Sequence, residues 1–146
     1  MSPKIINLLN RLITYSVYAI YPIIFIALIW NQDERAWRVF LAPAISFILV
    51  SIFRNKLNAP RPYEVNDTTP LIKKDTKGKS FPSRHVFSVF VIASTLYFIS
   101  QPLGIILMLA GVILAFLRVI GGVHFPRDVI AGAVIGILSG VLGFYL

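Results

Sequence analysis

Five apolar runs, separated by shorter polar segments, dominate the hydrophobic pattern of this chain. The runs are Ile13–Trp30, Trp37–Phe53, His85–Ser100, Leu103–Ile120 and Asp128–Leu146. Each is close to the roughly 20 residues that an α-helix needs to cross the hydrocarbon core of a bilayer. The pattern predicts an all-α, polytopic membrane helix bundle with about five transmembrane helices.

The only long polar segment, Arg54–Arg84, contains four prolines and is expected to be irregular and to lie outside the hydrocarbon. Met1–Leu12 could pass for the start of a signal peptide, but the apolar run after it is too long and no small-residue cleavage site follows. No internal repeat interrupts the pattern, so residues 1–146 are expected to form a single integral membrane domain.

Composition supports the prediction of a membrane protein and shows that the chain is strongly basic. The chain is 57% hydrophobic with a mean hydropathy of +0.78, which is too apolar for a soluble domain and indicates a multi-pass protein of the cell membrane. Only 14% of its residues are charged, yet the net charge is +8. In a membrane protein this basic excess favours anionic headgroups or a phosphorylated substrate over nucleic acid. Because cysteine is absent, thiolate chemistry and sulfur-ligated metals are excluded.

The segment Arg118–Asp128 holds one of the two histidines and is the strongest candidate for chemistry. Pro126 suits the first position of a helix, so Asp128 would lie in its first turn, where the helix dipole favours a negative charge. His124 precedes that turn and could give one ring N–H to Asp128, leaving the other nitrogen free as a nucleophile or base. A histidine at the membrane interface beside a capping aspartate is the simpler alternative.

The expected topology places several cationic and titratable residues on one face of the membrane. They are Arg54, Arg61, Arg84, His85, Arg118, His124 and Asp128. Guanidinium groups suit bidentate contacts to phosphate oxygens, so this face is expected to carry an active site for phosphoryl transfer. A metal is not expected, because two histidines among converging arginines are a poor ligand set for a cation, and no other cofactor is indicated.

Ser83 precedes the third apolar run and could cap its helix, whose first backbone N–H groups would then point at an anion. Around it, three motifs occur in order. They are Arg54-x6-Arg61-Pro62, Pro82-Ser83-Arg84-His85 and Arg118-x5-His124-x3-Asp128. Together they resemble the signature motifs of the type 2 phosphatidic acid phosphatase superfamily, which includes membrane lipid phosphate phosphatases and the soluble vanadium haloperoxidases.

This resemblance implies a role for each matched residue. His124 would attack phosphorus and carry it as a phosphohistidine, with Asp128 holding its ring, and His85 would protonate the leaving group and later help to activate water. The phosphoryl oxygens would be bound by Arg54, Arg61, Ser83, Arg118 and the backbone N–H of Arg84. Phosphoryl transfer needs mainly positioning and a charged cradle, and these donors can supply both without a metal.

Three positions depart from the usual family pattern. Arg54 stands where the first motif usually has lysine, and Leu117 precedes the third motif where serine is usual. Arg84 replaces a glycine that is common in the second motif, and its extra charge could help a pyrophosphate or a second anionic group to bind.

Two further features are expected to serve packing or the membrane surface. Gly132, Gly136 and Gly140 recur every four residues and would allow close helix packing, within the bundle rather than in a dimer, although a homo-oligomer stays open. The basic cluster Lys73, Lys74, Lys77 and Lys79 is either a solvated segment near anionic lipid or a mobile gate.

The sequence therefore predicts a metal-independent membrane lipid phosphatase. Its substrate would be a phosphomonoester or pyrophosphate of the undecaprenyl pyrophosphate, phosphatidylglycerophosphate or phosphatidic acid class, entering sideways from the bilayer. A non-catalytic lipid-phosphate-binding or transport protein is the alternative, although the helix centres lack the ionisable residues that a transporter would need. Which side of the membrane the active site faces is left open.

Overall fold

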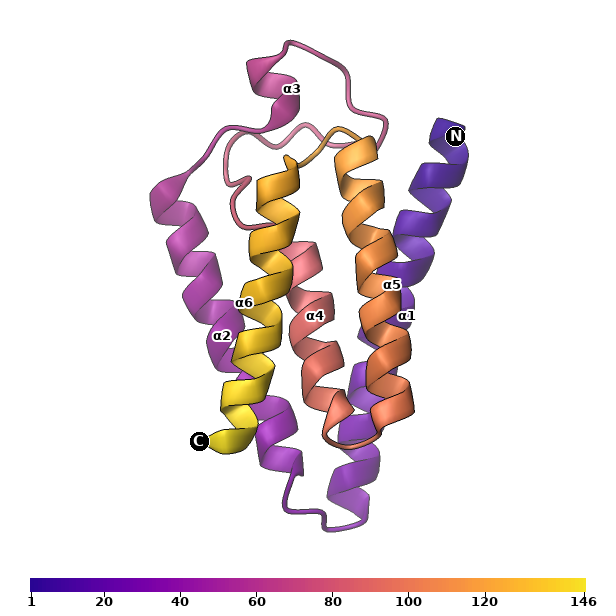
Figure 1. The fold of residues 1–146 in the computed structure, drawn as a ribbon, viewed down its shortest axis with the longest axis vertical. Coiled ribbons are helices and arrows are strands. Elements are labelled where there is room, and N and C mark those ends of the chain that lie inside the picture. The colour runs from indigo at the N-terminus through magenta and orange to yellow at the C-terminus, as the bar shows by residue number, and fades with distance from the viewer.

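A computed structural model describes all 146 residues of the chain, and it contains helices and no strands. The helices are α1 (Pro3–Trp30), α2 (Ala36–Leu57), α3 (Pro62–Val65), α4 (Arg84–Tyr97), α5 (Gln101–Ile120) and α6 (Pro126–Tyr145). Five of them form a bundle, and the short α3 lies in the long connection between α2 and α4 (Figure 1). The predicted all-α membrane bundle is confirmed.

The expectation of five spanning helices needs one correction. Helices α1, α2, α5 and α6 are long and apolar enough to cross a membrane. Helix α4 has only 14 residues, about 21 Å at 1.5 Å per residue, which is shorter than the hydrocarbon core of about 30 Å. The helix begins at Arg84, one residue before the predicted apolar run, and ends at Tyr97, three residues before the end of that run. The protein is therefore a multi-pass membrane protein with four helices that are long enough to span the bilayer, and α4 is shorter than a full span.

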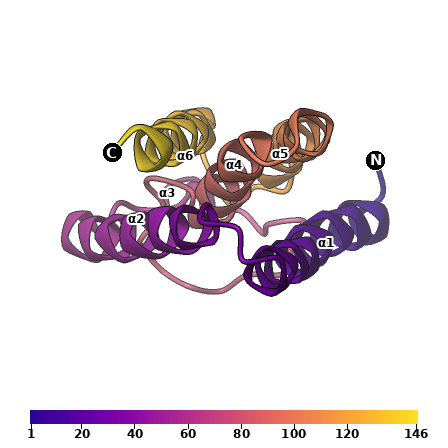
Figure 2. The same cartoon turned by 90° about the horizontal axis from the view of Figure 1, so that it is seen from below.

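Helix α4 is the central element of the bundle. It contacts each of the other four long helices, whereas α1 does not contact α6 and α2 does not contact α5. The view along the bundle shows α4 between the layer of α1 and α2 and the outer helices α5 and α6 (Figure 2). All residues from Val86 to Leu96 are buried, which agrees with a helix that is apolar on every side.

Helix α6 lies against α4 through its three evenly spaced glycines. A Cβ atom added at Gly132 would lie 2.7 Å from the carbonyl oxygen of Ser83, and one added at Gly136 would lie 2.8 Å from that of Phe87. A Cβ atom at Gly140 would overlap the side chain of Ser94. The glycines thus face a helix of the same chain, as expected for packing within the bundle.

One end of the bundle gathers the N-terminal end of α1, the long α2–α4 connection and the turn between α5 and α6 (Figure 1). Helix α1 begins at Pro3, ten residues before the apolar run that predicted it, because the preceding residues continue the same helix with Ser2 as its N-cap. Of the 14 Lys and Arg residues, only Arg35 and Arg38 belong to the opposite end, so twelve lie at this end of the bundle. The candidate site lies at this strongly basic end.

The close approach of α6 to α4 makes a stability prediction. Replacing Gly136 with alanine would place Cβ within 3.0 Å of backbone atoms of both Phe87 and Val91. Overpacking of this kind costs about 1–3 kcal/mol, so Gly136→Ala should lower the free energy of unfolding by that amount. Thermal unfolding in detergent measures the change. Val134→Leu is the matched control, because Val134 lies on the same helix with a side chain that is 50% exposed. Equal stability of wild type and Gly136→Ala would contradict the packing described here.

Candidate active site

Six of the eight predicted site residues, all except Ser83 and Asp128, line a polar cavity of about 180 Å³ at the basic end of the bundle. Its wall contains both histidines and no carboxylate. The lining residues are Arg54, Asn55, Arg61, Lys74, Thr76, Lys79, Arg84, His85, Arg118 and His124. His85 comes from the first turn of α4 and His124 from the turn before α6, so the fold brings the two imidazole rings to one small space. Six cationic side chains surround that space, which makes it suited to an anion and unsuited to a metal cation.

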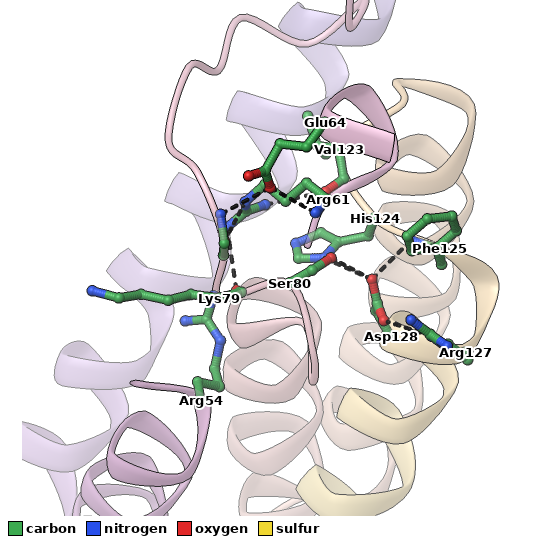
Figure 3. Close-up of polar contacts among 11 residues, drawn as sticks. Arg54, Arg61, Glu64, Lys79, Ser80, Val123, His124, Phe125, Arg127 and Asp128 are labelled. Carbon is green, nitrogen blue, oxygen red and sulfur yellow. Dashed lines mark hydrogen bonds and ion pairs between the residues drawn. The ribbon is translucent and has the colours of Figure 1, made fainter. Parts of the chain in front are cut away.

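His124 and Asp128 form the predicted pair. The Nδ1 atom of His124 lies 3.5 Å from Oδ2 of Asp128, and both side chains are almost completely buried. The hydroxyl of Ser80 lies beside them: it donates a hydrogen bond of 2.5 Å to the same Oδ2 and lies 3.4 Å from Nδ1 (Figure 3). Because Nδ1 faces the carboxylate, Nε2 on the opposite edge of the ring is the nitrogen left for a substrate in the cavity.

The start of α6 fixes the carboxylate. Pro126 occupies the first helical position and Asp128 the third, as the sequence predicted. Oδ2 of Asp128 accepts a 2.9 Å hydrogen bond from the backbone N–H of Phe125, while the carbonyl of Asp128 accepts one of 2.9 Å from the backbone N–H of Ser83. The second bond joins the beginnings of α4 and α6, so the segments that carry His85 and His124 are held to each other.

The pKa of His124 is lowered from its ordinary value to about 4, mainly by burial and further by the positive charges of Arg118 and Arg61. Asp128 opposes this shift, because its negative charge and hydrogen bonding favour the protonated ring. Since the folded-state pKa lies well below 7, His124 is neutral at physiological pH. A neutral imidazole is the form that can act as a nucleophile.

Two of the predicted phosphate-binding arginines also organise the loop around the cavity. Arg61, which is 2% exposed, donates hydrogen bonds of 2.9 Å to the carbonyl of Gly78 and 3.1 Å to that of Val123. Arg54 donates to the carbonyl of Lys79 (Figure 3). These contacts draw the α2–α4 connection over the site and leave part of each guanidinium group facing the cavity.

Arg118 is the arginine with the most unused hydrogen-bonding capacity. It is 3% exposed, and one of its terminal nitrogens lies 3.4 Å from the side-chain oxygen of Asn10 on α1. Its Nε and Nη2 atoms are buried without an acceptor in the protein, as is Nε of Arg54. Buried donors that lack a partner are costly, so this arrangement is suited to an anion that accepts several hydrogen bonds.

The two predicted residues at the start of α4 have different positions. Ser83 is the N-cap residue, but its side chain makes no capping hydrogen bond, its hydroxyl is buried without a partner, and it does not line the cavity. The prediction that the Ser83 side chain caps α4 is therefore wrong. Arg84 is exposed, lines the cavity, and places its guanidinium carbon 5.4 Å from the ring centre of Phe47.

An apolar groove of about 480 Å³ adjoins the polar cavity. Its wall is formed by α1, α2 and α4 and contains Tyr18, Tyr21, Phe40, Pro43, Ala44, Phe47, Arg84, His85, Ser88, Val91 and Ile92. Arg84 and His85 line both spaces, so the groove runs along the bundle up to the charged cavity. The arrangement can hold an amphipathic molecule with its charged head in the cavity and its apolar part between helices.

Sequence reasoning missed Ser80, which contacts the His124–Asp128 pair, and four residues that line the cavity: Asn55, Lys74, Thr76 and Lys79. Ser80 lies three residues before Ser83 in the segment Ser80-Phe81-Pro82-Ser83. Pro82 was the only residue of this segment that indicated a fixed turn, and nothing indicated that Ser80 would reach Asp128. Lys74 had been grouped with the basic loop cluster and nothing in the sequence separated it from the other three lysines. Only the course of the loop brings its side chain to the cavity.

Comparisons with known proteins identify the family of this chain. The model of the PAP2 superfamily, the type 2 phosphatidic acid phosphatases, matches residues 35–146, and the chain belongs to this superfamily. The matched region includes all three motifs, from Arg54 to Asp128.

Three relatives match part of the chain, of which one is named as a transport permease and two as undecaprenyl-diphosphatases. The chain is 33% identical over 66 residues to a bacitracin transport permease protein, BcrC, of Bacillus licheniformis, covering 45% of this chain and 32% of that protein. It is 32% identical over 85 residues to the undecaprenyl-diphosphatase BcrC of Bacillus subtilis (58% and 44%), and 28% over 121 residues to an undecaprenyl-diphosphatase of Sulfolobus acidocaldarius (82% and 59%). The chain thus spans less than two thirds of the length of each of these relatives.

A solved structure matches over nearly the whole chain. The crystal structure of LpxE from Aquifex aeolicus has 28% sequence identity and a TM-score of 0.74, with 99% of this chain and 93% of LpxE covered. The bundle with α4 at its centre is therefore the architecture of a known family member.

The position of Ser80 makes a prediction about turnover. In Ser80→Ala, Oδ2 of Asp128 would lose its shortest hydrogen bond, and the carboxylate would no longer be held at its present place beside His124. A hydrogen bond to a charged group is worth about 1.5–3 kcal/mol, so kcat should fall by roughly 10- to 100-fold. KM should stay close to the wild-type value, because Ser80 does not line the cavity.

Steady-state kinetics on any accepted phosphate ester test this prediction. Ser51→Ala is the control, since it also removes a buried hydroxyl, one that has no hydrogen-bond partner and does not line the cavity. A rise in KM at unchanged kcat would show that Ser80 contributes to binding and not to positioning.

Proposed function

We propose that this protein is a metal-independent membrane phosphatase that hydrolyses a phosphomonoester or diphosphate on a lipid through a phosphohistidine intermediate. The observation that carries this proposal is that two spaces adjoin: a cavity with two histidines and six cations shares Arg84 and His85 with an apolar groove between α1, α2 and α4. A lipid phosphate has both parts that this arrangement fits. The names of two relatives, both undecaprenyl-diphosphatases, agree with such a substrate.

In the first step, Nε2 of His124 attacks phosphorus and forms a P–N bond while the P–O bond to the lipid breaks. Asp128, beside Nδ1, stabilises the positive charge that develops on the ring. His85, in its protonated form, gives its proton to the departing oxygen. Burial and the surrounding positive charges lower the pKa of His85 to about 3. The negative charge of a phosphate dianion bound in the same cavity opposes this shift and favours the protonated form. The guanidinium groups of Arg54, Arg61 and Arg118 hold the phosphoryl oxygens.

In the second step, a water molecule attacks the phosphorus of the phosphohistidine. His85, now neutral, takes the proton from the water, the P–N bond breaks, and the electron pair returns to His124. Inorganic phosphate is released, and both histidines regain their starting state. The cationic side chains balance the charge of the phosphoryl group in both steps, so the chemistry needs positioning and electrostatics rather than a Lewis acid.

Among the candidate substrates, the position of Arg84 favours a diphosphate. Arg84 lines both the cavity and the groove, so its charge lies where the leaving group of a bound lipid would be. In a diphosphate that leaving group carries the second phosphate, which the guanidinium group can bind. Undecaprenyl pyrophosphate fits this arrangement better than phosphatidic acid, whose leaving group is an uncharged alcohol, or phosphatidylglycerophosphate, whose second phosphate is a phosphodiester separated from the terminal phosphate by a glycerol unit. Assembly into a homo-oligomer stays a prediction.

Phosphate release from a panel of lipid phosphates in detergent, with a chelator present, tests the reaction. Wild type should release phosphate, and His124→Ala should lose at least about a thousandfold in rate because it lacks the nucleophile. His85→Gln should lose about 10²- to 10⁴-fold, the usual contribution of a general acid or base. Lys77→Ala, on the surface of the loop, is the control. Chelator-sensitive release would overturn the metal-free mechanism, and no release by wild type would favour a lipid-binding or transport role.

A second variant tests the choice of substrate. Arg84→Gly should lower kcat/KM for undecaprenyl diphosphate by about tenfold more than for undecaprenyl monophosphate, since one charge-assisted contact to the proximal phosphate is lost. Lys56→Ala provides the control for charge, because Lys56 is exposed on the last turn of α2 and lines neither space. Equal losses on both substrates would contradict a leaving-group role for Arg84.

A further inference from the structure

One lysine of the basic loop differs from its neighbours in position. Lys73 and Lys77 are exposed, whereas Lys74 is half-buried and lines the polar cavity together with His85 and His124. It forms no ion pair with any carboxylate of the protein. An ammonium group in this position has no anionic partner until a ligand supplies one.

The loop holds Lys74 in place from its N-terminal side. The backbone N–H groups of Leu71 and Ile72 donate hydrogen bonds of 2.9 and 3.2 Å to the carbonyl of Gly121, in the turn that precedes His124. Ile72 is 4% exposed and packs in a cluster with Ile6, Leu117 and Val123. The side-chain amide of Asn7 donates a 2.8 Å hydrogen bond to the carbonyl of Leu71.

The C-terminal side of the segment is held as well. The hydroxyl of Tyr63 donates to the carbonyl of Thr76, and a carboxylate oxygen of Glu64 accepts a 2.9 Å hydrogen bond from the backbone N–H of Gly78. Arg61 donates to the carbonyl of the same glycine. Lys74 therefore lies on a segment that is anchored two or three residues away on each side, which does not suit the mobile gate considered from the sequence.

Lys74 also lies where the cavity adjoins the loop surface, and it does not line the apolar groove. The groove shares Arg84 and His85 with the cavity, whereas Lys74 is shared with an outer hollow of the loop surface, lined by Thr69, Pro70, Lys73, Lys74 and Asp75. A lipid phosphate bound from the groove would thus place its terminal phosphoryl oxygens toward Lys74. The same residue lies where inorganic phosphate would leave for water.

We propose that Lys74 is a phosphate-binding residue at the aqueous end of the cavity, which holds the transferred phosphoryl group and the phosphate product. This inference rests on the proposed function for the identity of the ligand. Arg54 takes the motif position where lysine is usual, and one of its donors is used by the carbonyl of Lys79. Lys74 then supplies the compact ammonium group from the loop.

The charge of Lys74 depends on pH within an accessible range. Its pKa is lowered to about 8, first by burial and then by repulsion from Arg61, Arg118, Arg54 and Arg84. Lys79, His85 and His124 line the same cavity, and Asp75 follows Lys74 in the outer hollow. The lowered pKa means that the amine is charged below about pH 8 and loses its charge above it. Phosphate affinity supplied by Lys74 should therefore be lost as the pH rises through that region.

Binding of inorganic phosphate to the detergent-solubilised protein, measured by titration calorimetry, tests the proposal without turnover. Lys74→Ala should raise the dissociation constant at pH 7 by about tenfold, the loss expected for one charge-assisted contact. Lys77→Ala, an exposed lysine of the same loop that does not line the cavity, should bind like wild type. Thermal unfolding of each variant verifies that the fold is intact.

Lys74→Arg supplies the second arm, because arginine stays charged at every pH used. The ratio of the wild-type to the Lys74→Arg dissociation constant should be constant below pH 7 and rise between pH 8 and pH 9.5. Ionisation of phosphate and of the histidines affects both proteins and cancels in this ratio.

Unchanged phosphate affinity in a folded Lys74→Ala, or a ratio that does not change with pH, would overturn the role of Lys74 and leave the proposed phosphatase activity standing. Failure of the wild type to hydrolyse any lipid phosphate would instead refute the proposed function, and phosphate binding would still report on Lys74 separately.

Discussion

The close approach of α6 to α4 is the constraint on which the site depends. Glycines at Gly132, Gly136 and Gly140 remove every side chain that would separate the two helices. At the basic end, the same contact is completed by the hydrogen bond between the backbone of Ser83 and the carbonyl of Asp128. Because His85 follows Ser83 by two residues and His124 precedes Asp128 by four, helix packing deep in the bundle sets the position of both imidazole rings. A change in the packing of α4 against α6 would therefore also displace the two histidines.

A second constraint is the excess of positive charge. Six cationic side chains line one small cavity without a carboxylate in its wall, and burial makes their mutual repulsion stronger than it would be in water. Part of this cost is offset by carbonyl groups: Gly78 and Val123 accept from Arg61, and Lys79 accepts from Arg54. The remaining donors, chiefly those of Arg118, have no protein partner. The cavity thus has hydrogen-bonding capacity that the protein itself does not use, and an anion with several oxygens would relieve both the repulsion and the missing hydrogen bonds.

The sequence predicted the parts of this structure that depend on local pattern. The apolar runs predicted the long helices, and the placement of Pro126 and Asp128 predicted the start of α6. Motif spacing assigned the arginines and histidines to one end of the bundle, because each motif adjoins the end of a run. Helix boundaries were less predictable: α1 begins ten residues before its apolar run, because Pro3–Leu12 mixes aliphatic with polar residues and still continues the helix, with Ile6 buried in a core cluster.

What the sequence could not predict depends on the path of the α2–α4 connection. Ser80 reaches Asp128 from 48 residues away in the chain, and Lys74 enters the cavity while its neighbours stay exposed. Neither position follows from periodicity, since the loop has none and its course is set by contacts to Arg61, Glu64 and Gly121. Ser83 shows the reverse case. Its residue type and position favoured a capping hydrogen bond, but its side chain makes none. The backbone of Ser83 instead packs closely against α6 at Gly132.

The cavity adjoins an apolar groove and an outer polar hollow, and these two spaces suit different products of the proposed reaction. An apolar tail can leave the cavity only along the groove between α1, α2 and α4, where Phe40, Pro43 and Phe47 offer no partner for a charge. Free phosphate has the opposite preference, since transfer of an ion into such surroundings is strongly unfavourable. Phosphate must therefore leave on the loop side, past Lys74 and the outer hollow. In the proposed reaction, the lipid product would return to the bilayer along the groove, and the difference in polarity between the groove and the outer hollow would separate the two products.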